Sequence, residues 1–257
     1  MMVSSVVVSR CRGLVRLEGR WGAGVPRFGG VVRRMGAVSG AASFQKRGLV
    51  STTATTTTTA KTEIETEKKV HMLTRSEDPL VWIDCEMTGL NTTTDVLLQV
   101  ACYITDSNLN VLDPNGFESV IHRPHSKLAE MDEWCIETHG RTGLTQRVLD
   151  STATVQEVES RLLEYIKQYV PEKRTALLAG NSVHADKVFL AKEMSSVIEW
   201  LHYRILDVSA VKEGARRWCS EEVLSGVPKK METHEARQDI LESIEEMRYW
   251  REKLFSK

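Results

Sequence analysis

The chain has 257 residues, of which 41% are hydrophobic and 27% are charged, and its formal net charge is −1. This composition is ordinary for a globular protein, and the length allows one sizeable α/β domain or two small ones. No apolar run approaches the roughly 18 residues that a membrane-spanning helix requires, so an integral membrane protein is not expected. The five cysteines show no C-x-x-C spacing and do not indicate a zinc site.

The basic residues are concentrated in the first part of the chain. Residues 1–50 contain eight Arg and Lys46 against the single acid Glu18, a balance of +8, which leaves −9 for residues 51–257. An Arg-rich, acid-poor leader with dispersed apolar residues is typical of a mitochondrial transit peptide. A disordered basic arm that binds nucleic acid or an acidic partner is the alternative. The acidic remainder is poorly suited to salt-driven binding of long polyanions, which requires many Lys and Arg contacts to phosphate.

A threonine-rich stretch separates this leader from the rest of the chain. The threonine run offers nothing to bury, so residues 51–74 are expected to form a disordered linker. We therefore expect a transit peptide over residues 1–50, whose cleavage site the sequence does not define, and one folded domain over residues 75–257.

The folded domain opens with a segment that carries two closely spaced carboxylates. Residues 80–83 are apolar and Thr88-Gly89 interrupts the run, which predicts a buried strand that ends in a turn. Side chains alternate across a strand, so Asp84 and Glu86 point to the same face. Two buried carboxylates on one face favour a hard divalent cation between them. A solvated rim at a strand end is the alternative interpretation.

Two further apolar segments follow at short intervals. Residues 95–106 and residues 111–122 are expected to be strands, and Asn108-Leu109-Asn110 supplies a turn between them. Connections this short join antiparallel strands, so the first three strands are expected to form a meander.

Helices and strands alternate in the second half of the domain. Residues 154–157 (TVQE) form a capping box before an amphipathic segment that ends near Tyr169. Strands are expected over residues 176–182 and 203–208, each followed by a helix, and a long helix over residues 236–254. The fold class is therefore α/β, a mixed sheet in which an antiparallel meander adjoins parallel strands and helices flank the sheet.

Two later motifs add titratable groups to the carboxylate pair. The stretch GNSVHAD places Asp186 one turn into a helix behind a strand end, and THEARQD places His234 and Asp239 near the start of the last helix. Five residues of helix span ~500°, which would leave His234 and Asp239 on different faces if both were helical. His234 is therefore expected on the loop just before that helix. Taken singly, His234 is also compatible with a capping histidine, and Asp239 with an exposed carboxylate.

Six stretches of the chain, taken together, resemble a known nuclease family. They are WIDCEMTGL, ACYITDSNLN, WCIETHGRTGLT, LAGNSVHADK, YRILDVSAVKEGARRW and HEARQDI, and they run in family order from about residue 80 to residue 254. The sequence resembles the DEDD-type 3′-to-5′ exonucleases of the His-containing subgroup, and most closely the oligoribonucleases, including their mitochondrial form.

This resemblance implies a ribonuclease H-like fold and a two-metal site. The residues that match the family's metal ligands are Asp84, Glu86, Asp186 and Asp239, which would hold two Mg²⁺ or Mn²⁺ ions. Two such cations suit carboxylate ligands and can stabilise both the attacking and the leaving oxygen of a phosphodiester. His234 matches the general base that takes a proton from the attacking water, a role that suits an imidazole.

The resemblance also implies residues that bind the substrate. Leu90 matches a residue that the family inserts as a wedge between two bases, and Trp134 matches an aromatic residue on which a base stacks. Packing in the hydrophobic core is the alternative for both residues. Polar groups around the 5′ phosphate match Ser182 and His139, with Tyr203, Arg204 and Ser209 supplied by the second subunit of a homodimer. Arg204 can bind a phosphate through two hydrogen bonds, whereas an ordinary edge-strand pair is the alternative for Tyr203-Arg204.

Three positions depart from the family pattern. Gln99 stands where relatives commonly carry an acid, Gln238 replaces an acid next to the last predicted ligand, and Arg237 replaces a common Leu. The four predicted metal ligands and His234 are all retained. The departures are therefore expected to change hydrogen bonding around the site and the reaction rate, but not the class of reaction.

The sequence therefore predicts a homodimeric, metal-dependent 3′-to-5′ exoribonuclease located in the mitochondrial matrix, with an additional cytosolic pool left open. Its predicted substrates are short RNA oligonucleotides, above all dinucleotides, which it would degrade to nucleoside 5′-monophosphates. A general exonuclease that trims RNA or DNA and a catalytically silent nucleotide-binding protein on the same fold are the alternatives.

Overall fold

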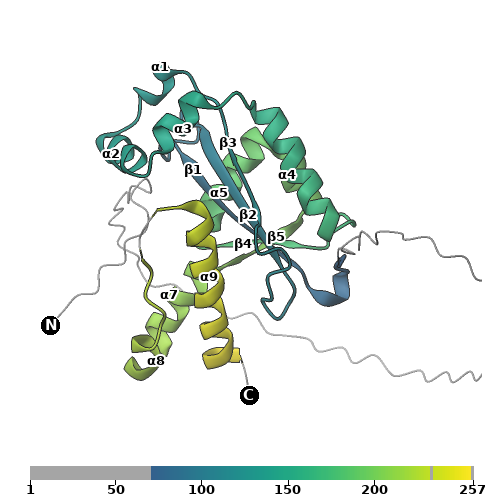
Figure 1. Cartoon of the computed structure of the whole chain (residues 1–257). Helices are drawn as coiled ribbons and strands as arrows, with labels where there is room; N and C mark the ends of the chain where they lie inside the picture. The colour runs from purple at the N-terminus through teal and green to yellow at the C-terminus, as the bar shows by residue number, and fades with distance from the viewer. Residues whose placement is uncertain (1–70, 232–233, 256–257) are drawn as a thin grey trace, which may run out of the picture. The chain divides into compact units, whose positions relative to one another are not determined.

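A computed structural model describes residues 71–231 and 234–255 of the chain. The transit peptide predicted over residues 1–50, and the predicted linker as far as residue 70, lie outside the described residues. A five-stranded sheet with the order β3-β2-β1-β4-β5 forms the centre of the described domain (Figure 1). Its strands are β1 (Leu80–Met87), β2 (Leu97–Thr105), β3 (Phe117–Val120), β4 (Leu177–Gly180) and β5 (His202–Asp207).

The sheet combines antiparallel and parallel pairs, as the sequence predicts. β1 pairs antiparallel with β2, and β2 with β3, which gives the predicted meander. β4 pairs parallel with β1 on the opposite edge, and β5 pairs parallel with β4. The predicted α/β mixed sheet is thereby confirmed.

Helices cover both faces of the sheet. The helices are α1 (His125–Leu128), α2 (Glu133–Arg141), α3 (Leu144–Asp150), α4 (Val155–Tyr169), α5 (Val183–Glu193), α6 (Ser195–Trp200), α7 (Val208–Trp218), α8 (Glu221–Ser225) and α9 (Ala236–Trp250), with short helical turns at Arg75–Glu77 and Arg251–Phe255. No helix among the described residues is long and apolar enough to cross a membrane.

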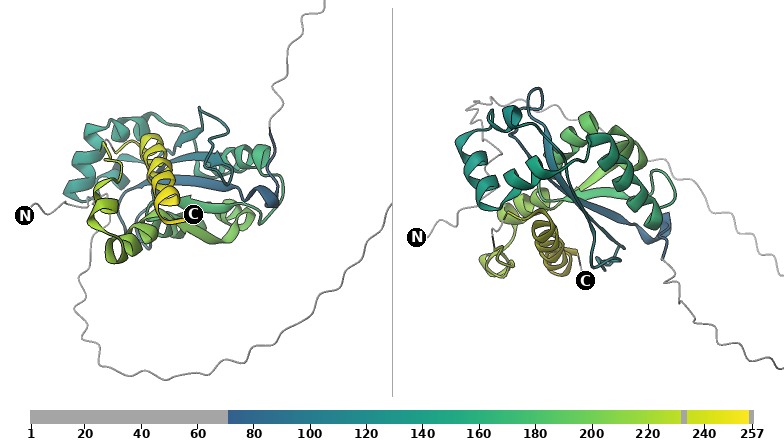
Figure 2. Two further views of the ribbon diagram at one scale, coloured as in Figure 1. Left: turned by 90° about the horizontal axis from the view of Figure 1, so that it is seen from below. Right: turned by 45° about the horizontal axis from the view of Figure 1, so that its top comes forward.

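The alternation of side chains along β1 distributes the core between the two faces. Ile83 and Cys85 point into a buried cluster that α4 and α5 complete. Trp82 points to the other face, where it packs with Ile240 and Trp250 of α9, and Figure 2 shows α9 lying along that face. Since Asp84 and Glu86 share the parity of Trp82, they emerge on the α9 side of the sheet.

One predicted strand is shorter than expected. The third strand, predicted over residues 111–122, is confined to Phe117–Val120, and Val111 contributes only an isolated bridge to Thr105. Pro114 has no backbone N–H to donate to a neighbouring strand, and Gly116 adopts a φ of +60°, so this segment forms a loop.

The capping box at the start of α4 supports a prediction of stability. Thr154 Oγ accepts the Glu157 N–H at 3.3 Å, and the Glu157 carboxylate accepts the Thr154 N–H at 2.8 Å. Thr154→Ala should lower the free energy of unfolding by about 1 kcal/mol because the first-turn N–H loses its acceptor. Urea unfolding of this variant and of Thr154→Ser, which keeps the hydroxyl, checks the prediction; equal losses in the two variants would contradict it.

Candidate active site

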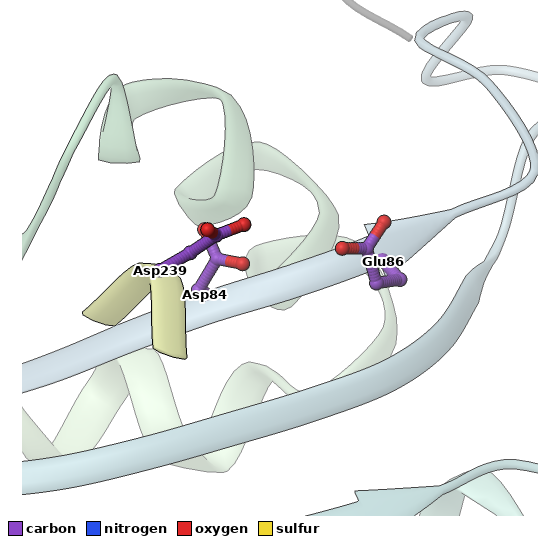
Figure 3. Close-up of side chains that lie close together, drawn as sticks. All are labelled: Asp84, Glu86 and Asp239. Atoms are coloured by element: carbon purple, nitrogen blue, oxygen red, sulfur yellow. The ribbon is translucent and has the colours of Figure 1, made fainter. Parts of the chain in front are cut away.

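Three carboxylates meet at the carboxyl end of β1. Asp84 and Glu86 project from the same side of the strand, and Asp239 reaches them from the first turn of α9 (Figure 3). Each residue offers an oxygen that lies within 4.8 Å of the oxygens of the other two, and all three residues are half-buried. The predicted alternation on β1 is confirmed, and Asp239 lies near the start of the last helix as predicted.

Asp186 approaches the same strand end from a different direction. β4 pairs with β1 only as far as Trp82, so the edge of β1 beyond that residue is open to another partner. The Asp186 carboxylate, fully buried on the first turn of α5, accepts the N–H of Cys85 at 3.0 Å. Cys85 lies between Asp84 and Glu86, so the fourth predicted carboxylate is bound to the backbone between the first two, outside the group of three.

Glycine is required where β4 turns towards α5. A Cβ on Gly180 would lie 2.9 Å from the carbonyl oxygen of Ile83, which is closer than side-chain carbons approach a backbone oxygen. This close approach brings the start of α5, and with it Asp186, against β1.

His139 of α2 is packed against the end of β1. Its Nε2 donates to the carbonyl oxygen of Met87 at 3.0 Å, and its Nδ1 lies 4.0 Å from a Glu86 carboxylate oxygen. Burial lowers the pKa of His139 and keeps the ring neutral at neutral pH. This contact fixes α2 next to Glu86.

His234 lies on the loop immediately before α9, as the spacing of His234 and Asp239 predicts. Its backbone adopts a φ of +57°, which non-glycine residues rarely do. Its ring meets the ring of Trp134 edge to face, with 5.8 Å between the ring centroids. Trp134 belongs to α2 and Leu90 follows β1, and both are half-buried and pack against the small cluster around Leu98.

The residues predicted to surround the substrate's 5′ phosphate lie in three places: Ser182 and Ser209 just after β4 and β5, Tyr203 and Arg204 near the start of β5, and His139 on α2. Ser182 and Ser209 belong to the same chain and their hydroxyl oxygens lie 3.1 Å apart. Tyr203 is 71% exposed and the Arg204 guanidinium lies 5.5 Å from the centroid of its ring. A single chain is described, so the predicted contribution of a second subunit stays a prediction.

The three departures from the family pattern surround the site without replacing a carboxylate. Gln99 pairs with Glu86 across β1 and β2, and its amide donates to Glu118. Arg237 contacts the Tyr103 hydroxyl at 3.2 Å, and Gln238 donates to Glu242 at 3.1 Å.

Asp207 is the main residue of this region that the sequence analysis missed. Its carboxylate accepts the backbone N–H groups of Ser182 and Ser209 and the hydroxyl of Ser209. The spacing Asp207-Val208-Ser209 at a strand-to-helix junction is a helix-capping signal that could have identified it.

The donors at the end of β1 fit a divalent cation. Three carboxylates within 4.8 Å of one another repel unless a positive charge lies among them. An all-oxygen, anionic donor set suits Mg²⁺ or Mn²⁺ better than a metal that prefers nitrogen or sulfur. These three residues therefore could hold a hard cation.

Comparison with known proteins agrees with this geometry. The family model described as "Exonuclease" (RNase_T) matches residues 81–247. A probable oligoribonuclease of Schizosaccharomyces pombe is 53% identical over 175 residues, which cover 68% of either chain. The chain belongs to the oligoribonucleases of the exonuclease family. Mitochondrial oligoribonuclease of Homo sapiens is 47% identical over 178 residues, which cover 69% of this chain and 74% of the human protein.

Solved structures show the same fold at low sequence identity. Exonuclease I of E. coli in complex with a dA16 oligonucleotide aligns with a TM-score of 0.55 and 13% identity. The alignment covers 69% of this chain and 41% of exonuclease I, so the chain corresponds to less than half of that protein. Membership of the family makes the chain a 3′-to-5′ exonuclease, a hydrolase of phosphodiester bonds.

Proposed function

We propose that the protein is an exoribonuclease that hydrolyses short oligoribonucleotides, above all dinucleotides, from the 3′ end to nucleoside 5′-monophosphates. The observation that supports this reaction best is the group of three carboxylates, Asp84, Glu86 and Asp239, with His234 on the loop that leads into the helix of Asp239. The preference for short substrates is supported by the oligoribonucleases to which the chain is similar.

Asp84, Glu86 and Asp239, with Asp186, would hold two Mg²⁺ or Mn²⁺ ions. When bound, these ions neutralise charge on the reacting phosphodiester and favour ionisation of water. His234 takes the proton of the attacking water at a ring nitrogen, as the water oxygen bonds to phosphorus and the bond to the leaving 3′ oxygen breaks. The edge-to-face contact with Trp134 orients the ring for this step.

The other predicted residues would bind the nucleotides. Leu90 and Trp134 pack against the same small cluster and would contact the bases, a mode of binding that tolerates any base sequence. The neutral His139 ring gives its only N–H, at Nε2, to the Met87 carbonyl, so Nδ1 has no proton to donate to a phosphate and the role of His139 in this tautomer is to position α2.

The protein would act as a homodimer in the mitochondrial matrix. Tyr203 and Arg204 of a second subunit would close over the 5′ phosphate of the substrate, whereas Ser209, which the sequence predicts to come from that subunit, lies beside Ser182 of its own chain. The mitochondrial location is supported by relatives named mitochondrial in Homo sapiens, Bos taurus, Mus musculus and Saccharomyces cerevisiae. The same proposal includes a transit peptide over residues 1–50, a linker over 51–74 and an exonuclease domain over 75–257. It also includes an additional cytosolic pool.

The decisive experiment is turnover of end-labelled RNA from two nucleotides upward, with Mg²⁺, with Mn²⁺ and with a chelator. We expect metal-dependent release of mononucleotides, fastest on the dinucleotide and falling sharply beyond a few nucleotides. Equal turnover of long strands would favour a general trimming exonuclease. Absence of turnover with either metal would favour a nucleotide-binding protein on the same fold.

A substitution of Arg204 tests the proposed closure of the second subunit over the substrate's 5′ phosphate. Arg204→Ala should lower kcat/KM for a dinucleotide by about tenfold, which is the loss of one charge-assisted phosphate contact. A longer substrate should lose less, because that contact is a smaller share of its binding. The ratio of the two losses is the measurement, with Arg75→Ala as an exposed control outside the site. Equal losses at all lengths would remove Arg204 from the proposed cap.

A further inference from the structure

The parallel half of the sheet brings two helix starts together at one point. β4 and β5 end at Gly180 and Asp207, which are paired in the sheet, and each strand leads directly into a helix, α5 or α7. The first backbone N–H groups of the two helices therefore lie side by side, and each needs an acceptor.

One carboxylate serves both helix starts. Asp207 Oδ1 accepts the N–H of Ser182 at 2.8 Å, the N–H of Ser209 at 3.0 Å and the hydroxyl of Ser209 at 2.6 Å. Its Oδ2 accepts from Nδ1 of His184 at 3.0 Å. Burial opposes ionisation, but the hydrogen bonds from Ser209, His184 and Ser182 outweigh it and lower the pKa of Asp207. The carboxylate is therefore ionised and acts only as an acceptor.

This arrangement determines the direction in which the two serine hydroxyls donate. The Ser209 hydroxyl has a single proton and gives it to Asp207, so its oxygen is left to accept the Ser182 hydroxyl at 3.1 Å. Ser182 is the one member of the pair whose proton can be redirected to an incoming phosphate without breaking a bond to a carboxylate.

Asp207 also holds Ser182 in an unusual backbone conformation. Ser182 precedes α5 with a φ of +54°, in the left-handed region, and its side chain makes no helix-capping hydrogen bond. A serine at this position normally caps the helix with its own hydroxyl. Here the Asp207 carboxylate accepts the Ser182 N–H instead, and the Ser182 hydroxyl points to Ser209.

We propose that Asp207 is a positioning residue that sets the Ser182–Ser209 hydroxyl pair for recognition of the substrate's 5′ phosphate. This inference rests on the proposed function, because it assigns the substrate end that the pair would meet. Asp207 itself does not contact the substrate; it acts through the two serines. Its contribution depends on the position of the carboxylate oxygen and not on the negative charge.

Two conservative variants separate position from charge. Asp207→Asn keeps an acceptor oxygen at the same place and removes the charge, whereas Asp207→Glu keeps the charge and moves the oxygens by one methylene. The substrates are the dinucleotides pApA and ApA, which differ only in the 5′ phosphate, and the measurement is the ratio of their kcat/KM values with Mg²⁺. Thr154→Ala, a helix-cap deletion on α4, controls for a loss of stability alone.

We expect Asp207→Glu to lower the pApA/ApA ratio by about tenfold, the effect of one lost hydrogen bond to a charged group, through KM for pApA. Asp207→Asn and Thr154→Ala should keep the ratio within about twofold. Three results would overturn the inference. They are an unchanged pApA/ApA ratio in Asp207→Glu, an equal fall of that ratio in both Asp207 variants, and an equal fall of kcat on both substrates. Wild-type enzyme that turns over pApA and ApA equally would instead refute the 5′-phosphate cap of the proposed function.

Discussion

Asp239→Asn is expected to lower kcat on a dinucleotide by about 10³-fold at saturating Mg²⁺. Asp239 brings the third carboxylate to Asp84 and Glu86 from a different element, so its loss leaves two carboxylates on a single strand and Asp186, which is bound to the backbone of that strand. A neutral amide is a weak ligand for a hard cation, and the bound metal contributes several kcal/mol of transition-state stabilisation. Single-turnover rates on a labelled dinucleotide check the prediction.

The same variant separates metal binding from folding. Without metal, Asp239→Asn should melt no lower than the wild type, because it removes one of three mutually repelling charges. With metal, the increase in melting temperature should be smaller than in the wild type, since ligand binding stabilises in proportion to affinity. Glu235→Gln, an exposed change just before the same helix, is the matched control. Near-normal turnover by Asp239→Asn would refute the assignment of Asp239 as a ligand.

The strands and long helices could be predicted because strong local signals mark them. The apolar run before Asp84 and the capping box at Thr154 agree with β1 and α4, and the apolar spacing from Ala236 agrees with α9. In each case the residues that the pattern places inward are those that the sheet buries, so local propensity and packing favour the same structure.

The helices between β3 and α4 could not be predicted in this way. α1 and α3 are short, and α2 contains Gly140 with the weak helix formers Thr138 and Cys135. These helices depend on tertiary contacts such as the bond between His139 and the carbonyl of Met87. Such a contact joins residues 52 positions apart and leaves no periodic trace in the sequence.

The candidate site likewise contains residues that local sequence predicts and residues whose position depends on tertiary contacts. Strand alternation places Asp84 and Glu86 on one face from the sequence alone. The contact of Asp186 with the Cys85 N–H depends on β4 ending short, and the role of Asp207 depends on two helices starting beside one another. Sheet register determines both, and the sequence of a single strand does not contain it.

His234→Ala is expected to lower kcat by 10²- to 10⁴-fold, the usual contribution of a general base. KM should change little, because the carboxylates and Trp134, which would bind the metal and the bases, are retained. The His234 ring contacts Trp134 at the edge of the site, and truncation leaves a space beside that ring. Added imidazole should therefore restore part of the rate in His234→Ala and have no effect on the wild type.

A control and a second variant separate base catalysis from loop conformation. His71→Ala, which removes an exposed histidine paired with Glu77, should retain wild-type kcat. His234→Asn preserves a residue that tolerates a positive φ but cannot accept the proton, so it should lose as much activity as His234→Ala. Recovery of activity in His234→Asn, or no response of His234→Ala to imidazole, would assign His234 to the conformation of the loop before α9. Asp239 would then depend on His234 for its approach to β1, and the proton of the attacking water would require a different acceptor.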